Sequence, residues 1–572
     1  MTAIPNAALA DLPDHTPVLI AGGGPSGLFL ALDLAHRGIP SLVIEPRTAI
    51  DPDRPRAKTT NARTMTHLRR LGLADRLRAA APLPVGYAQD VIFCSALTGH
   101  EVTRFREAFQ LVPGRYGPQP ECGQQVPQPV MEGVLRDAAG ESPLITLLTG
   151  LRVEDLDATG GNGPRVTVSD AAGQRKDVDC SFVAAADGGS STVRRRLGIR
   201  LAGSSAELSN ISVLFRSDTL AAAITLEPAV QYWVLGPDVA GMVGRLDLGN
   251  TWWAIIQGVD GTGSVGAESL VRSLVGTDVD VEVIATDPWT ARMLLAPDYG
   301  HHRVFLVGDA AHLNPPWGGH GFNTCIGDAA NLAWKIAAAL GHWAGPALPG
   351  SYALERRPVA ARTIRDAAAN GQALAYHFAD PALGLDGAAG DAARQAAKAA
   401  LAVKQSEFDS LGLVLGYGYG SSPLVVPDGL PVPEEHPVRY VPSASPGSLL
   451  PHAWLDESTS LYDLLGSGFT LLVDRERLAG RAAPEAYAAV LAAAAVHGIP
   501  VAFAGVGPDR DGTAMSTHWQ ADAVLVRPDQ HVAWRGADPV QAAAAIGVAA
   551  GWPPATTSED PDRSSRVRAH FP

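Results

Sequence analysis

The sequence predicts an α/β fold with a Rossmann-type dinucleotide-binding domain, an inserted antiparallel β-sheet domain and a separate C-terminal domain. Near the N-terminus, a buried strand passes through a Gly-x-Gly-x-x-Gly turn into a helix. Residues 205–260 show four strand patterns rich in aromatics, which favours an antiparallel sheet. Seven prolines in residues 421–450 mark a linker before the last part of the chain. Since 572 residues exceed the size of one hydrophobic core, two to four domains are expected.

The first anchor of the fold is a βαβ unit in residues 16–46. The apolar run 18–21 enters a turn whose glycines are Gly22, Gly24 and Gly27, with Pro25 and Ser26 between the last two. Gly22 permits the tight turn, Gly24 lets a pyrophosphate approach the backbone, and Gly27 lets the helix pack closely on the strand. A second strand ends at Glu45, 18 residues after Gly27, where an acid accepts hydrogen bonds from an adenosine ribose.

Composition and charge limit the classes of protein. The net charge of −14 argues against nucleic acid or an anionic membrane surface as a partner. No apolar run reaches the roughly 18 residues that span a bilayer, and no basic segment followed by an apolar one opens the sequence. The four cysteines are scattered without metal-ligand spacing. A cytoplasmic protein with reduced thiols, no metal and no membrane span is therefore expected.

Two further buried strands end in an acid beside glycine, as strands do at a ligand crevice. The apolar run 178–186 ends before Asp187, and the run 304–307 ends before Gly308 and Asp309. A carboxylate at the end of a buried strand is costly unless it is paired, so Asp309 is expected to be buried and to accept hydrogen bonds.

A glycine-rich turn follows Pro316 and precedes a long helix, expected from about 324 to 340. Backbone N–H groups at the N-terminus of such a helix favour an anion. His312 and His320 flank this turn. Lone histidines are more often structural than catalytic, and both are kept as candidates for proton transfer.

The inserted sheet supplies candidates for a pocket. Neighbouring residues on a strand point to opposite faces. Each aromatic pair, Tyr232–Trp233 and Trp252–Trp253, therefore either places one member in the pocket and packs the other outside, or belongs to an aromatic core. Arg245 is either a ligand contact or a solvated surface charge. No Ser-His-Asp order or paired-carboxylate spacing stands out, which disfavours hydrolase chemistry.

Five segments carry a resemblance to a known family. They are GGGPSG at 22–27, ADGGSSTVRRRLG at 186–198, GDAAHLNPPWGGHGFNTCIGDAANLAWKIA at 308–337, YALERRP at 352–358 and SLGLVLGYGYGSSPLVVPDG at 410–429. Together they resemble the FAD-dependent aromatic hydroxylases of the p-hydroxybenzoate hydroxylase fold, in the phenol hydroxylase-like branch that ends in a thioredoxin-like domain. The resemblance covers residues 16 to about 545, and its most specific part is 308–337.

The resemblance implies a domain organisation. An FAD-binding domain takes residues 1–204 and 296–420, a substrate-binding sheet takes 205–295 with part of 83–120, a linker takes 421–450, a thioredoxin-like domain takes 451–552, and a tail takes 553–572. Because residues 451–552 contain no cysteine, thiol redox chemistry is excluded there. Packing or homodimer formation is the expected role of this domain.

The resemblance also implies a set of FAD-binding residues. Arg56 and Gln128 are expected at the pyrophosphate or ribityl region, Asp309 at the ribityl hydroxyls, and the backbone amides of residues 321–323 at the flavin N1 and C2=O. Asp187 matches an Asp-Gly motif linked with both FAD and nicotinamide nucleotide. The full set is Gly22, Gly24, Pro25, Ser26, Gly27, Glu45, Arg56, Gln128, Asp187, Asp309, Pro316, Gly321, Phe322 and Asn323.

The implied reaction is hydroxylation of a phenolic or polycyclic aromatic substrate by O2, with NADPH or NADH as reductant, through a flavin C4a-hydroperoxide. The implied pocket residues are Tyr232, Trp233, Arg245, Trp253 and Pro316, and the candidates for catalysis are His312, His320 and Arg245. Some phenol hydroxylases carry an acid two places after the loop arginine, where it activates the phenol. Lys58 stands there in this chain, which leaves the route of phenol deprotonation open.

Three alternatives remain beside the monooxygenase. The first is an FAD-dependent oxidoreductase that acts without oxygen insertion. The second is an NAD-dependent dehydrogenase, which does not explain segment 308–337. The third is a catalytically idle flavoprotein that serves as a binding module.

Overall fold

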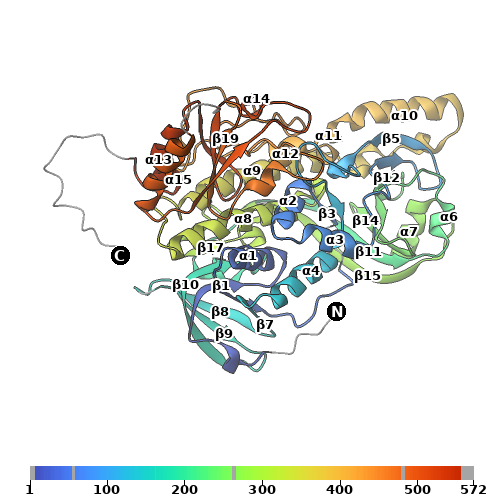
Figure 1. Cartoon of the computed structure of the whole chain (residues 1–572). Helices are drawn as coiled ribbons and strands as arrows, with labels where there is room; N and C mark the ends of the chain where they lie inside the picture. The colour runs from blue at the N-terminus through green and yellow to red at the C-terminus, as the bar shows by residue number, and fades with distance from the viewer. Residues whose placement is uncertain (1–6, 55–57, 162, 260–265, 478–482, 555–572) are drawn as a thin grey trace.

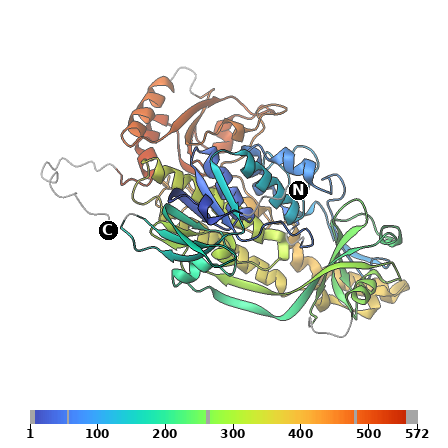
Figure 2. The same cartoon turned by 90° about the horizontal axis from the view of Figure 1, so that it is seen from below.

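The computed structural model describes residues 7–54, 58–161, 163–259, 266–477 and 483–554. Three large sheets and the two-stranded pair β3-β6 organise these residues. The inserted sheet lies apart from the C-terminal domain, with the dinucleotide-binding domain adjoining both (Figures 1 and 2). This arrangement matches the fold class that the sequence predicts. Among the described helices, none combines the length and apolar character needed to cross a membrane.

The first sheet carries the dinucleotide-binding domain. Its order is β16-β17-β10-β1-β2-β7, and the five strands from β17 to β7 run parallel. Their bounds are β1 (His15–Ala21), β2 (Ser41–Glu45), β7 (Ile145–Thr149), β10 (Arg175–Ala185), β16 (Gly300–His301) and β17 (Val304–Leu306). β8 (Arg152–Asp157) and β9 (Arg165–Ser169) extend β10 as an antiparallel meander. Parallel strands buried on both faces explain why their sequences read as continuous apolar runs.

Helix α1 (Pro25–His36) packs between α4 (Gln128–Glu141) and α8 (His320–Leu340) beside this sheet. α8 begins four residues earlier than the sequence suggested, directly at the glycine-rich turn. Residues 321–323 therefore belong to its first turn rather than to a preceding loop. α9 (Ser351–Gly371) packs against α8.

The inserted sheet has eight strands in the order β18-β15-β11-β14-β13-β12-β4-β5. All its pairs are antiparallel except β12 with β4. The strands are β4 (Val91–Cys94), β5 (Glu101–Phe105), β11 (Ala202–Arg216), β12 (Gln231–Leu235), β13 (Ala240–Arg245), β14 (Thr251–Gln257), β15 (Glu282–Leu295) and β18 (His312–Leu313). Because β18 belongs to the segment that leads into α8, this sheet is hydrogen-bonded directly to the dinucleotide-binding domain.

The C-terminal domain is a four-stranded mixed sheet of order β20-β19-β21-β22. The strands are β19 (Phe469–Asp474), β20 (Val501–Val506), β21 (Ala523–Val526) and β22 (Val532–Gly536), and only β19 and β20 are parallel. Helices α13 (Ala483–Ala495) and α15 (Ala542–Ala549) cover one face. Trp334 and Ala338 of α8 are buried in that same hydrophobic cluster, so this domain shares a core with the helix that leads from the glycine-rich turn.

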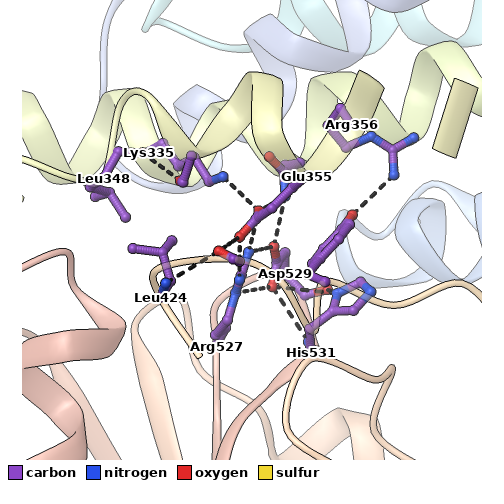
Figure 3. A network of polar contacts seen from close by, with 12 residues as sticks. Lys335, Leu348, Glu355, Arg356, Leu424, Arg527, Asp529 and His531 are labelled. Atoms are coloured by element: carbon purple, nitrogen blue, oxygen red, sulfur yellow. Dashed lines mark hydrogen bonds and ion pairs between the residues drawn. The ribbon is translucent and has the colours of Figure 1, made fainter. Parts of the chain in front are cut away.

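A buried network of charges joins the two domains (Figure 3). Arg527 from the C-terminal domain donates hydrogen bonds to Glu355 of α9 and to Asp529. Lys335 of α8 donates to the same Glu355 carboxylate at 2.6 Å. These two cations and two anions are buried and satisfy one another, as buried charges require.

Candidate functional site

The glycines of the first turn have different surroundings. Gly22 has a φ of +102°, and a Cβ added there would overlap the Ala186 carbonyl oxygen. A Cβ added at Gly27 would overlap the Gly22 carbonyl oxygen. At Gly24, by contrast, an added Cβ would meet no described atom within 4 Å. The protein itself requires glycine at the first and last positions, whereas Gly24 faces open space that fits a ligand approaching the backbone.

Pro25 and Ser26 form the first turn of α1 behind these glycines. The Ser26 hydroxyl lies beside Gly308, because a Cβ added to that glycine would lie 2.9 Å from the Ser26 oxygen. The first glycine turn and the strand end before Asp309 are therefore neighbours in space.

Glu45 lies at the end of β2 with its carboxylate beside the glycine turn. Its Oε2 accepts the Gly23 N–H at 2.7 Å, and its Oε1 accepts the Arg47 Nε–H at 2.7 Å. Arg47 also donates to Glu132 of α4 at 2.8 Å. A carboxylate has about four acceptor positions, so Glu45 keeps capacity for a ribose hydroxyl. Sequence reasoning missed Arg47, although an arginine two residues after the acid was a visible signal.

Asp187 holds the turn that follows β10. Its Oδ2 accepts the backbone N–H groups of Thr192 and Val193 at 2.7 and 3.2 Å, while its Oδ1 is buried without a hydrogen-bond partner among the described residues. Buried acceptors normally have a hydrogen-bond partner, so this oxygen is suited to accept a hydrogen bond from a polar group of a bound ligand.

Arg194 connects this turn to the next one. Its guanidinium donates to the carbonyl oxygens of Ala310 at 3.0 Å and Gly189 at 2.8 Å. The side chain is buried. Sequence reasoning missed this role, because a contact across 116 residues leaves no local pattern.

Asp309 differs from the sequence expectation of a buried, paired carboxylate. β17 and Val307 are buried, but the Asp309 side chain projects outward and is exposed. Its hydrogen bond within the described protein is from the Cys325 thiol, 3.5 Å away. An exposed carboxylate beside the glycine turn can accept hydroxyl groups of a bound ligand without a change in the protein core.

The glycine-rich turn is shaped by two left-handed residues, Gly318 and Gly319, with φ values of +79° and +66°. Gly319 is the N-cap of α8, so the N–H groups of Gly321 and Phe322 lack partners within the helix. Pro316 is exposed at the start of this turn. An anionic group or a polarised carbonyl would be stabilised at this helix end.

Asn323 fastens the turn through its side chain. Its Oδ1 accepts the Asn61 N–H at 3.0 Å, and its Nδ2 donates to the carbonyl oxygens of Thr59 at 3.0 Å and Gly319 at 2.7 Å. The sequence prediction concerned the backbone amide of this residue. The structure adds a positioning role for the side chain.

His312 is fully buried and both of its ring nitrogens have hydrogen-bond partners. Its Nε2 is 2.8 Å from Asp328 Oδ2, and its Nδ1 is 3.1 Å from Asn314 Oδ1. Asp328 also accepts from Arg356 Nε at 2.8 Å. Since both ring nitrogens are engaged, this geometry supports a positioning role rather than proton transfer to a substrate.

His320 lies at the start of α8 beside a cavity of about 30 Å³. Its Nε2 has no hydrogen-bond partner among the described residues. Burial lowers the pKa of His320 to about 4, so the imidazole is neutral at pH 7. Arg63 and His67 line the same cavity, which is large enough for one water molecule.

The aromatic residues of the inserted sheet divide between its two faces. Trp233 and Trp253 belong to a buried cluster with Trp317 of the glycine-rich turn and Phe408. We call this side of the sheet the aromatic face. It packs against Trp317 and against buried residues of the segment 374–408 that follows α9.

Tyr232 and Trp252 lie on the opposite face, in the cluster with α7 (Ala267–Val275). Arg245 also belongs there, because its guanidinium lies 4.9 Å above the Trp252 ring and donates to the Asp247 and Leu248 carbonyl oxygens. The sequence prediction that Tyr232 and Arg245 share a pocket with Trp253 is therefore corrected. Successive residues of a strand point to opposite faces, so Tyr232 cannot share a face with Trp233, nor Trp252 with Trp253.

Three residues named in the sequence analysis remain: Lys58, Gln128 and Arg56. Lys58 Nζ is 4.3 Å from the ring centroid of Trp253, at the aromatic face. Gln128 is half-buried at the first position of α4. Arg56 lies outside the described residues. Within the described part of the chain, no group of three or more His, Cys, Asp or Glu residues could hold a metal ion.

The fold and the site together define an α/β protein with a dinucleotide-binding domain and a separate, mostly antiparallel sheet. Comparison with known families refines this class: residues 15–367 match the FAD binding domain model, and residues 443–552 match the model described as aromatic-ring hydroxylase, C-terminal. The chain therefore belongs to the family of FAD-dependent aromatic-ring hydroxylases, and it is an FAD-dependent enzyme.

Individual proteins support this assignment over more than nine-tenths of the chain. The FAD-dependent monooxygenase apdD of Emericella nidulans is 32% identical over 564 residues, covering 91% of this chain and 87% of that protein. The 2,4-dichlorophenol 6-monooxygenase of Delftia acidovorans is 30% identical over 576 residues, covering 91% and 95%. The crystal structure of the flavin-dependent monooxygenase PieE with FAD and substrate is 30% identical, has a TM-score of 0.83, and covers 94% of this chain and 99% of its own.

Proposed function

We propose that this protein hydroxylates a phenolic or polycyclic aromatic substrate, using O2 and either NADPH or NADH, by way of a flavin C4a-hydroperoxide. The observation that carries the proposal is the meeting of the glycine-rich turn with the aromatic face. Trp317 of that turn packs in one buried cluster with Trp233 and Trp253. An aromatic ring held against this face would lie beside the turn that the family resemblance associates with the flavin.

The cofactor-binding roles follow from the same geometry. We assign the FAD pyrophosphate to the open space at Gly24 and the adenosine ribose to Glu45. The exposed carboxylate of Asp309 is assigned to the ribityl hydroxyls, and Gln128 and Asp187 to polar contacts at the same cofactor. When bound, FAD supplies hydride acceptance and the activation of O2.

The protein groups have three tasks in this reaction. The N–H groups of Gly321 and Phe322 stabilise negative charge on the reduced cofactor. Asn323 fixes the turn that carries them. Trp253 and Trp317 exclude water and provide an apolar surface for the substrate ring, which protects a reactive oxygen species from hydrolysis.

A panel of phenols and polycyclic phenols tests this function. Purified holoenzyme is mixed with NADPH or NADH, and nucleotide oxidation, O2 uptake, peroxide and product mass are followed together. A substrate is expected to raise nucleotide oxidation and to give a product heavier by one oxygen atom. If peroxide accounts for all O2 consumed and no panel member gains oxygen, the oxidoreductase without oxygen insertion takes the place of this proposal.

A further inference from the structure

The backbone of Lys58 is fixed between two parts of the site. Its carbonyl oxygen accepts the Val126 N–H at 2.8 Å. The following residue, Thr59, begins β3 (Thr59–Thr60), and its carbonyl oxygen accepts a hydrogen bond from Asn323 of the first turn of α8. A Cβ added to Gly319 would lie 3.1 Å from the Thr59 Cβ, so β3 runs directly beside the glycine-rich turn.

The side chain of Lys58 reaches the aromatic face. Its Nζ lies 4.3 Å from the ring centroid of Trp253, within the range of a cation–π contact. On its own sheet the Trp253 ring covers Gly244, where an added Cβ would overlap the ring atoms. Lys58 and Trp253 thus form a defined pair at the junction of the glycine-rich turn and the inserted sheet.

The environment of this ammonium group is poor in water. Lys58 is half-buried, and burial lowers its pKa to about 8. A partly desolvated cation gains more from an anionic oxygen than an exposed lysine does, because the medium around it screens charge less. Its neighbour Trp253 is itself buried, so an apolar ring borders the ammonium group on this side.

We propose that Lys58 binds the phenol oxygen of the substrate and holds it as the phenolate, a specificity and catalytic role that rests on the proposed function. The O–H bond of the phenol breaks, its electron pair stays on oxygen, and the proton leaves to solvent when Lys58 is already charged or to Nζ when it is neutral. Both routes end in the same ammonium–phenolate pair. Since a phenolate ring is more electron-rich than a phenol ring, this pair prepares the substrate for electrophilic oxygen.

The position makes chemical sense of a sequence difference. Where some phenol hydroxylases carry an acid that accepts the phenol proton, this chain carries a cation. A carboxylate would activate a phenol by proton removal, whereas Lys58 would do so by stabilising the product of ionisation. The expected selectivity is for acidic phenols over their methyl ethers.

Binding of 4-nitrophenol to the FAD-loaded enzyme tests this role without NAD(P)H or turnover. Only the phenolate form of this probe has a strong visible band, so difference spectra at a pH below its pKa in water report its ionisation when bound. Wild-type enzyme is expected to bind the phenolate. Lys58→Met is expected to weaken phenolate binding by about 10- to 100-fold, the loss typical of a hydrogen bond to a charged group.

Three variants control this experiment. Lys58→Arg keeps the cation and is expected to retain phenolate binding, whereas Lys58→Gln replaces Lys58→Met if the latter does not hold FAD. Lys398→Met removes an exposed charge on α10 (Gly387–Leu401) and is expected to behave as wild type.

The proposal is overturned if wild-type holoenzyme binds the probe only as the neutral phenol, does not bind it, or binds the phenolate no better than the Lys58→Met and Lys58→Gln variants. Because binding is measured without reaction, loss of phenolate binding in these variants supports Lys58 even if no hydroxylated product is found. Hydroxylation of a panel phenol together with unchanged probe binding would instead retain the proposed function and reject Lys58.

Discussion

The Arg527 guanidinium donates two hydrogen bonds, of 2.6 and 2.7 Å, to the Glu355 carboxylate, and both side chains are buried (Figure 3). This fork joins β21 and its following turn to α9. Burial raises the pKa of Glu355, but Arg527 and Lys335 outweigh this effect and hold the pKa at about 2. The cysteine-free C-terminal domain is therefore tied by charge to the helices behind the glycine-rich turn.

Replacing Arg527 tests this connection. Arg527→Met leaves the buried Glu355 carboxylate paired with Lys335 and removes the arginine that pairs with the Asp529 carboxylate. The free energy of unfolding is expected to fall by about 3–5 kcal/mol, the cost of breaking a buried ion pair. Urea unfolding measures it, and Arg510→Met, which removes an exposed pair with Asp511, is the control. Equal stability of the two variants would mean that the network adds nothing to the domain contact.

Two glycine substitutions separate folding from cofactor binding. Gly24→Ala is expected to leave the apoprotein as stable as wild type within about 0.5 kcal/mol, because the added Cβ meets no atom. FAD binding should weaken by at least about tenfold, since the methyl group occupies the cofactor's approach. Gly27→Ala should instead prevent folding, because its Cβ overlaps the Gly22 carbonyl. Fluorescence titration with FAD and thermal melts measure the two effects, and unchanged FAD affinity in Gly24→Ala would contradict the site.

Removal of the Asp309 carboxylate, which follows β17, tests the proposed contact of this residue with FAD. Asp309→Ala is expected to raise the Kd for FAD by about 10- to 100-fold through loss of charge-assisted hydrogen bonds. Since the side chain is exposed, the apoprotein should keep its stability. Equilibrium dialysis of apoprotein with FAD measures the change, and Asp511→Ala is a matched exposed control. Normal FAD content in Asp309→Ala removes this residue from the site.

The burial of neutral His320 leads us to expect that the protein is less stable in acid. Its pKa is about 4 in the folded chain against an ordinary value of 6.5, because burial disfavours the charged imidazole. As the pH falls, His320 is therefore protonated in the unfolded chain before it is protonated in the folded chain. The free energy of unfolding that the neutral imidazole contributes above pH 6.5 is lost as the pH falls toward 4. This shift corresponds to about 3 kcal/mol. Unfolding of FAD-saturated protein across this range should show a shallower loss in His320→Gln than in wild type or in the exposed-site control His301→Gln. Parallel curves for all three would show that His320 is not buried neutral.

Sequence patterns predicted the elements that are determined by residues close together in the chain. The Gly22 turn follows from the spacing of glycines after an apolar run, and the structure has the strand, turn and helix expected of it. The aromatic alternation predicted two faces for the inserted sheet, which the structure has, but it could not say which face meets the other domain. For this reason the sequence analysis listed Tyr232 and Arg245 with the pocket residues, although they lie on the face opposite Trp253.

Contacts between distant segments could not be predicted. Arg194 reaches Ala310, Asn323 reaches Thr59, and Arg527 reaches Glu355 across 172 residues, with no periodicity to mark the partners. The start of α8 was placed four residues late because Gly318 and Gly319 read as a loop. In the structure Gly319 is the N-cap residue and the helix begins at His320.

The origin of the inserted oxygen tests the central claim most directly. Holoenzyme is supplied with NADPH or NADH, a panel phenol that accelerates nucleotide oxidation, and ¹⁸O2 in unlabelled water, and the product is analysed by mass spectrometry. A monooxygenase must place one labelled atom in the ring product and the other in water. Product labelled from H2¹⁸O instead, or product of unchanged mass with all consumed O2 released as peroxide, would contradict oxygen insertion by this enzyme.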